Sequence, residues 1–396
     1  MDHESICVLR VDDETPDQRN PSRPSPRASP SQFADGLSHD IRTPLTVIRE
    51  FASIMREGLG GPVTERQQQY LAIIIARVDD LTLTVDDLLD ASALDAGLLN
   101  LWRRKIQPSE MIDRVRKALE LRAEARRIDV EIALDEPLPA VYCDAEKIVR
   151  AIVHLAAYAF KVEPVGGRIR LWAKRCANGQ DVLFGVSGAS STAADTAATC
   201  EPFPQLGWDA DTSFDRFGLG LNVARELVHV NLGALRVYGE AGAAVAFALT
   251  LPADEPLQLF SRYLDFVLAG CGSPARPCLV ALLTAEIDPG ADAKLLSAAD
   301  GFLHAIVSGG ELVYRFDDRH WALAVRRQPE ELNRLAPRIE REWTQFSENR
   351  PAGTPPALSL NSLGSWRADR GRGALVAAFA AAMDKLAGEQ GPSEIV

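Results

Sequence analysis

Residues 38–46 read SHDIRTPLT, and they lie inside an apolar repeat of helical period. Large apolar side chains recur three and four residues apart, at Phe33, Leu37, Ile41, Leu45, Ile48, Phe51 and Met55. This spacing predicts an amphipathic helix. The glycines and the proline in residues 58–62 end that helix.

A second helical repeat follows directly. Its apolar residues alternate three and four apart, at Leu71, Ile74, Val78, Leu81, Val85 and Leu88. Two such helices joined by a short glycine turn form an antiparallel hairpin, and one hairpin cannot bury both apolar seams. A homodimer would bury them in a four-helix bundle. The alternative is a hairpin that packs only on its own neighbouring domain.

The string HDIRTPL, residues 39–45, resembles the H box of the sensor histidine kinase family. The resemblance implies that His39 accepts a phosphoryl group. It also implies that Asp40 orients the ring and assists proton removal, and that Thr43 helps to place a water that removes phosphate from a response regulator. The chemistry agrees, because histidine titrates near neutral pH and a neighbouring carboxylate can set its tautomer. A lone helical histidine is otherwise usually exposed or structural.

The composition limits the other functions. The chain has 396 residues and a formal net charge of −12, which favours several domains and argues against nucleic-acid binding. None of its six cysteines forms a CxxC pair, so we expect no metal site and a reducing compartment. No apolar run reaches the ~18 residues of a spanning helix, so we expect a cytoplasmic protein without a membrane segment.

The residues after the hairpin mix helices with short strands. Strand-like runs at 130–134, 168–173, 182–186, 235–238 and 244–249 predict helices on one face of a mixed sheet. Gly218 and Gly220 in the string GLGLNVAREL resemble the G2 box of the family's ATP-binding domain, where backbone amides approach phosphate at a helix N-terminus. The resemblance implies an α+β sandwich of histidine-kinase ATPase type, with ATP and Mg²⁺ as cofactors. Lys161 stands at the expected N-box lysine.

Two positions depart from the family pattern. Tyr158 replaces an asparagine that helps to hold Mg²⁺, and a phenol is a poor ligand at neutral pH. Gly188 replaces an aspartate that accepts from the adenine amino group, and losing such a bond costs about 1.5–3 kcal/mol. We therefore expect weakened nucleotide binding. The alternative is a shifted alignment around these residues.

The C-terminal part predicts a smaller α/β domain. Its string LVYRFDDRHWALAV, residues 312–325, resembles a degenerate GGDEF (diguanylate cyclase) hairpin. Arg319 and His320 replace the acidic residues of that signature, so we expect no cyclase activity. A generic interaction domain with an Asp-Asp turn is the alternative.

These patterns describe a multidomain chain. We expect a disordered Pro- and Ser-rich segment at 1–32, a phosphoacceptor hairpin at 33–102, an ATPase-like domain at 103–254 and the α/β domain at 255–396. Three functions remain open. The chain is a histidine kinase that serves a response regulator receiver domain, a dimeric phosphotransfer protein that takes phosphate from another protein, or a non-catalytic adaptor that binds regulators.

Overall fold

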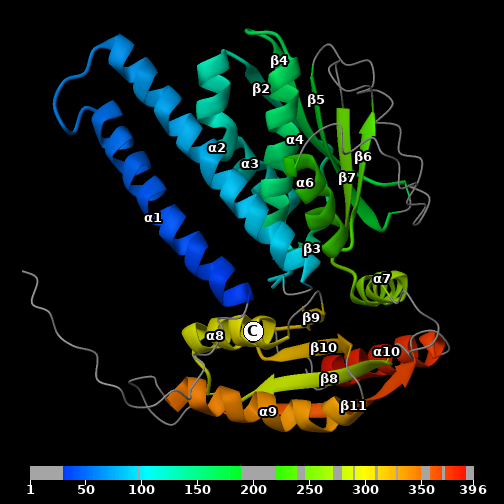
Figure 1. Ribbon diagram of the computed structural model, residues 1–396. Coiled ribbons are helices and arrows are strands. Elements are labelled where there is room, and N and C mark those ends of the chain that lie inside the picture. Colours follow the sequence, from blue (N-terminus) through cyan, green and yellow to red (C-terminus); the bar gives the residue numbers. More distant parts are fainter. Residues whose placement is uncertain are drawn as a thin grey trace, which may run out of the picture.

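The structure is a computed structural model that describes residues 30–96, 99–177, 179–188, 219–238, 246–270, 279–288, 290–307, 311–326, 329–348, 357–367 and 371–388. It consists of a helical hairpin (residues 30–96), a central unit (residues 99–254) and a C-terminal unit (residues 255–388), as Figure 1 shows. Among the residues described, no helix combines the length and apolarity needed to cross a membrane.

The hairpin contains α1 (Pro30–Arg56) and α2 (Glu65–Asp95), which lie side by side (Figure 1). Thr64 begins α2 with a capping box, because its side chain accepts from the Gln67 amide while the Gln67 side chain accepts from the Thr64 amide. The two predicted helices are confirmed. Helix α1 begins at Pro30, so the last residues of the segment predicted to be disordered are helical, and residues 1–29 lie outside the described part.

The apolar seams of the hairpin are only half covered. Five residues, Leu45, Ala52, Leu71, Ile75 and Val78, are buried between or beside the two helices. Six others keep 43–64% of their surface exposed: Ile48, Phe51, Met55, Ile74, Leu81 and Leu88. The expectation that one hairpin leaves much of its seam uncovered is therefore confirmed.

The central unit is a five-stranded mixed sheet with helices on one face (Figure 1). Its strands are β2 (Asp129–Leu134), β4 (Arg168–Arg175), β5 (Asp181–Gly188), β6 (Ala234–Tyr238) and β7 (Ala246–Pro252), and its helices are α3 (Pro108–Arg126), α4 (Ala145–Val162) and α6 (Leu219–Val230). The order is β2-β4-β5-β7-β6, with only β2 and β4 parallel. The predicted α+β arrangement is confirmed.

A small second sheet in the central unit was not predicted. It pairs β1 (Arg104–Ile106) with β3 (Val141–Cys143) in antiparallel register. Each strand has three residues, which is too short to show a clear period of two in the sequence.

The C-terminal unit has a four-stranded antiparallel sheet in the order β11-β8-β10-β9. Its elements are α7 (Pro256–Ala269), β8 (Leu279–Ile287), α8 (Ala293–Ile306), β9 (Leu312–Arg315), β10 (His320–Arg326), α9 (Pro329–Glu348), β11 (Leu358–Arg367) and α10 (Arg372–Gly388). From β8 to β11 the succession is βαββαβ, which is the ferredoxin-like arrangement. Helices α8 and α9 pack on one face, and α7 and α10 on the other.

The predicted hairpin of this unit is present. Strands β9 and β10 flank the turn at Asp317 and Asp318. The Asp317 carboxylate accepts from the amides of Arg319 and His320 at 2.7 and 2.9 Å. This carboxylate is therefore occupied in shaping its own turn.

Candidate functional site

The residue predicted to carry phosphate lies in the third turn of α1. The backbone of His39 is helical, and its side chain lies outside the described part. Asp40 and Thr43, its two predicted assistants, are exposed. These two side chains are therefore accessible to a partner.

An ion pair ties α1 to α2 one turn after His39. The Nε and Nη2 atoms of Arg42 donate to Oδ1 of Asp86 at 2.9 and 2.6 Å. Asp86 is half-buried and begins the acidic stretch of α2 that also contains Asp87 and Asp90. These carboxylates face the central unit as well as α1.

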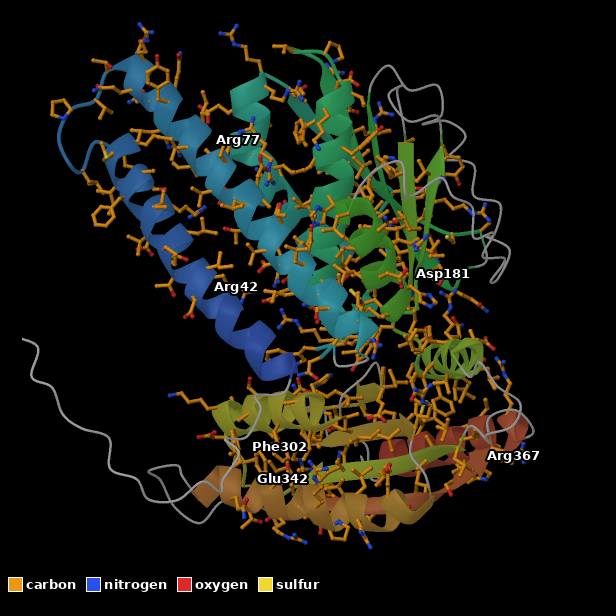
Figure 2. The ribbon with its side chains drawn as sticks, in the orientation of Figure 1. Arg42, Arg77, Asp181, Phe302, Glu342 and Arg367 are labelled. Atoms are coloured by element: carbon orange, nitrogen blue, oxygen red, sulfur yellow. The ribbon has the colours of Figure 1, made fainter. Side chains whose placement is uncertain are left out.

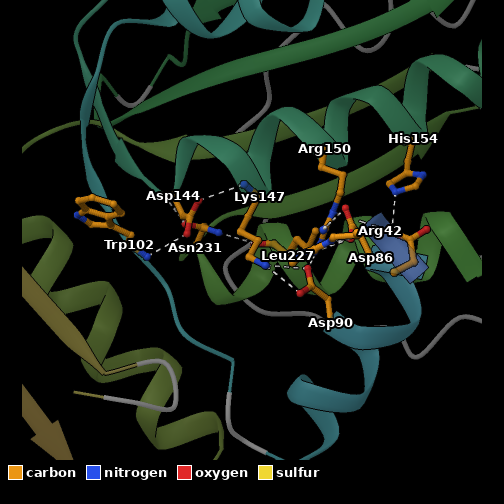
Figure 3. Close-up of polar contacts among 11 residues, drawn as sticks. Arg42, Asp86, Asp90, Trp102, Asp144, Lys147, Arg150, His154, Leu227 and Asn231 are labelled. Atoms are coloured by element: carbon orange, nitrogen blue, oxygen red, sulfur yellow. Dashed lines mark hydrogen bonds and ion pairs between the residues drawn. The ribbon is translucent and has the colours of Figure 1, made fainter. Parts of the chain in front are cut away.

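Three side chains on one face of α4 pair with the acidic stretch of α2 (Figure 3). Lys147 Nζ lies 2.8 and 3.0 Å from the two carboxylate oxygens of Asp90, and Arg150 also pairs with Asp90. His154 Nε2 lies 2.8 Å from Oδ1 of Asp87. We refer to this group as the latch, and its members are Arg42, Asp86, Asp87, Asp90, Lys147, Arg150 and His154.

The latch is largely shielded from water except at Arg42, whose side chain is 52% exposed. Asp87 and Asp90 are 3% and 7% exposed. Burial lowers the pKa of the Lys147 ammonium and of the Arg150 guanidinium. Removing one partner of a buried pair costs about 3–5 kcal/mol, against about 0–1 kcal/mol for an exposed pair. The latch therefore holds α4, and with it the central unit, against the hairpin.

The first turn of α4 is fixed by Asp144. This N-cap carboxylate accepts from the amides of Lys147 at 3.1 Å and Trp102 at 2.9 Å. Its own amide donates to Oδ1 of the fully buried Asn231 at 2.7 Å. The start of α4, the end of α6 and the connector (residues 99–103) between the hairpin and the central unit thus meet at one carboxylate (Figure 3).

The predicted phosphate-binding glycines are only partly described. Gly218 lies outside the described residues. Gly220 lies in the first turn of α6, and a Cβ there would lie 2.9 Å from Nδ1 of His154. Glycine at 220 is therefore explained by close packing on an imidazole that also contacts α2. Lys161, near the end of α4, is exposed.

Tyr158 belongs to the packing of the central unit. Its ring meets Phe247 of β7 edge-on, with centroids 5.7 Å apart and an interplanar angle of 86°. Among the described residues, no three His, Cys, Asp or Glu side chains are grouped as a metal would require. Tyr158 therefore presents a packed phenol at the position where the family pattern has an asparagine.

The structure explains why position 188 holds a glycine, and the sequence alone did not reveal this reason. Gly188 ends β5, and a Cβ there would lie 2.2 Å from Oε2 of Glu163, the residue that follows α4. The same side chain crowds Gly167, where a Cβ would lie 2.7 Å from Cγ of Glu163. Glu163 is 4% exposed, so its carboxylate fills the space beside Gly188. No local pattern in the sequence marks this contact.

Comparison with known proteins agrees with the geometry of the hairpin. Residues 30–97 match the family described as the His Kinase A (phospho-acceptor) domain. The chain is 28% identical over 224 residues to the alginate biosynthesis sensor protein KinB of Pseudomonas aeruginosa, covering 56% of this chain and 37% of that protein. These findings support a place in the sensor histidine kinase family.

Other relatives extend the similarity past the hairpin. Histidine protein kinase DivJ of Caulobacter vibrioides is 24% identical over 247 residues, covering 62% of this chain and 41% of that protein. The chain thus spans less than half of the length of both curated relatives. Full-length ShkA in complex with AMPPNP matches with 26% identity and a TM-score of 0.37, over 56% of this chain and 46% of that one.

Proposed function

We propose that this chain is a two-component signalling protein that carries a phosphoryl group on His39 and exchanges it with the aspartate of a response regulator receiver domain. The observation that carries the proposal is the HDIRTPL string on an exposed turn of α1, inside a hairpin that matches the phospho-acceptor family. Asp40 orients the imidazole and assists proton removal, and Thr43 helps to place the water that removes phosphate from the regulator.

The proposed protein is a homodimer. The exposed half of the apolar seams, which includes Phe51, Ile74 and Leu81, supports a second copy of the hairpin as its cover. Packing the two hairpins in a four-helix bundle removes this surface from water and leaves the start of α1 open to the regulator.

The proposed ATPase-like unit binds nucleotide weakly. Three observations support this: the edge-on packing of Tyr158, the Glu163 carboxylate beside Gly188, and the contact of His154 with Asp87. Phosphate then reaches His39 from another phosphorylated protein, and the central unit acts as a scaffold.

The C-terminal unit is proposed to be a degenerate relative of the GGDEF domain without cyclase activity. Its ferredoxin-like succession and the β9–β10 turn at Asp317 and Asp318 support the kinship. The Asp317 carboxylate is committed to the amides of its own turn, which supports the absence of a catalytic metal there.

Phosphotransfer from a labelled receiver domain tests the function. The wild-type chain should gain acid-labile phosphate from the phosphorylated receiver, and His39→Gln should gain none while keeping its circular dichroism and its mass. No label on either protein would favour the adaptor, which binds regulators without accepting phosphate, and equal label on both would place the phosphate on a residue other than His39. A parallel incubation with ATP and Mg²⁺ distinguishes the kinase from the phosphotransfer protein.

A further inference from the structure

The C-terminal unit shares a core with the central unit. Tyr142 of β3 and Leu232, just after α6, pack in one apolar cluster with side chains of α7, β8, β9, β10 and α10. The Tyr142 hydroxyl donates to the Val313 carbonyl of β9 at 3.0 Å. At the lower end of the central sheet, Asp181 pairs with Arg262 of α7 (Figure 2). The two units are therefore joined by apolar packing, a hydrogen bond and an ion pair.

The connector lies at this junction and contacts both units. Leu99 and Leu101 are buried in the core of the central unit. The Trp102 indole Nε1 donates to Oδ2 of Asp300, in α8, at 2.8 Å. The other oxygen of Asp300 accepts from Nε1 of Trp321, in β10, at 2.8 Å. One buried carboxylate thus joins the connector to the sheet of the C-terminal unit.

Arg103, the next residue of the connector, bridges the same two units. Its Nη1 donates to the Glu311 carbonyl of the C-terminal unit at 2.8 Å, and its Nη2 donates to the Val230 carbonyl of the central unit at 2.6 Å. The residue is 1% exposed. A guanidinium stays buried only while its acceptors are in place, so separating the units carries a large penalty.

We propose that the C-terminal unit is a built-in clamp, which holds the connector against the central unit and thereby supports the first turn of α4, from which Lys147 reaches the latch. A domain tethered as an independent output module would not accept a hydrogen bond from Trp102 or bury the Arg103 side chain. The clamp does not depend on His39 chemistry or on nucleotide binding. An experiment that disproves the clamp therefore leaves the proposed function untouched, and the reverse also holds.

The clamp is connected to the latch through Asp144. The Trp102 amide donates to Oδ2 of Asp144, and Oδ1 of the same carboxylate caps the Lys147 amide. Displacing the C-terminal unit, for example by a bound partner, would free Trp102 and loosen the first turn of α4. That turn supplies Lys147 to the latch, so the clamp controls how firmly the hairpin is held.

Hydrogen exchange of the full-length chain tests the clamp. Trp102→Phe removes the indole N–H donor while keeping an aromatic ring at this half-exposed position. Asp300→Asn replaces the carboxylate that accepts this hydrogen bond with a neutral amide. Both variants should raise exchange of the amides of residues 101–106, and of the Lys147 amide, at least tenfold over wild type. Circular dichroism verifies that the variants are folded. If Asp300→Asn is unstable, the connector exchange of Trp102→Phe alone tests the clamp.

Trp321→Phe is the matched control, because it removes the other indole bond of the same carboxylate inside the C-terminal unit. It should raise exchange in β10 and α8 and leave residues 101–106 within threefold of wild type. Connector exchange in Trp102→Phe within twofold of wild type would overturn the clamp. Equal connector exchange in Trp102→Phe and Trp321→Phe would also overturn it.

Discussion

At the scale of single residues, the contact between Glu163 and Gly188 explains the glycine differently from the sequence pattern. From the sequence alone, Gly188 is a lost aspartate that could be restored by substitution. In the structure, the Glu163 carboxylate occupies the space that a side chain at position 188 would need. The Glu163 side chain also packs closely against Gly167. Restoring the aspartate would therefore put two carboxylates into one buried space.

We predict that Gly188→Asp lowers the free energy of unfolding by about 2–3 kcal/mol, through overpacking and like-charge repulsion. Tyr158→Asn with Gly188→Asp should then fail to restore nucleotide binding. Removing Glu163 as well, by Glu163→Ala, should recover stability, with a coupling of about 1–3 kcal/mol in urea denaturation. Gly60→Ala is the control, because a Cβ at Gly60 meets nothing within 4 Å. Additive effects of the Gly188 and Glu163 substitutions would contradict the contact.

The latch is a property of whole elements, because it pairs one face of α2 with one face of α4. Asp90 pairs with both Lys147 and Arg150. We predict that Asp90→Asn removes the nearest charge partner of both cations, leaves Arg150 only its longer pairs with Asp86 and Asp87 at 3.9 and 4.0 Å, and weakens the docking of the central unit on the hairpin by about 3 kcal/mol. Small-angle scattering should show a larger radius of gyration for this variant.

Asp113→Asn is the matched control for the latch. Asp113 lies on α3, is largely exposed and pairs with Arg116 at 3.7 Å. Its removal should change stability by about 0.5 kcal/mol or less, with no change in radius. Identical scattering curves for Asp90→Asn and the wild type would mean that apolar contacts alone hold the hairpin in place.

The exposed seam of the hairpin makes the second prediction at this scale. Ile74→Asp with Leu81→Asp should convert a dimer into a monomer of unchanged helix content, because both side chains are exposed in the single chain. Light scattering gives the mass. Lys117→Asp introduces the same change in charge on the exposed surface of α3 and should leave the dimer intact. A doubly substituted protein of wild-type mass would place the dimer interface elsewhere.

Local periodicity was enough to predict most elements. Helices α1 and α2 and the β9–β10 hairpin follow from apolar spacing and turn residues. The latch left a partial signal, since Lys147, Arg150 and His154 recur three and four apart. Their partners on α2 could not be predicted, because a spacing shows which side chains share a face and not what that face meets.

The whole molecule depends on contacts that no local pattern encodes. Trp102 and Asp300 are 198 residues apart in sequence, and Arg103 and Glu311 are 208 apart. These contacts join the connector, the central unit and the C-terminal unit into one body beside a latched hairpin.

The most direct measurement locates the phosphate itself. The dimer should be incubated separately with a labelled phosphorylated receiver domain and with labelled ATP and Mg²⁺, then digested with trypsin at alkaline pH. We predict acid-labile label on the peptide of residues 28–42, which contains His39, with the receiver as the stronger donor. Label on another peptide, or none from either donor, would contradict the assignment of His39 as the phosphate carrier.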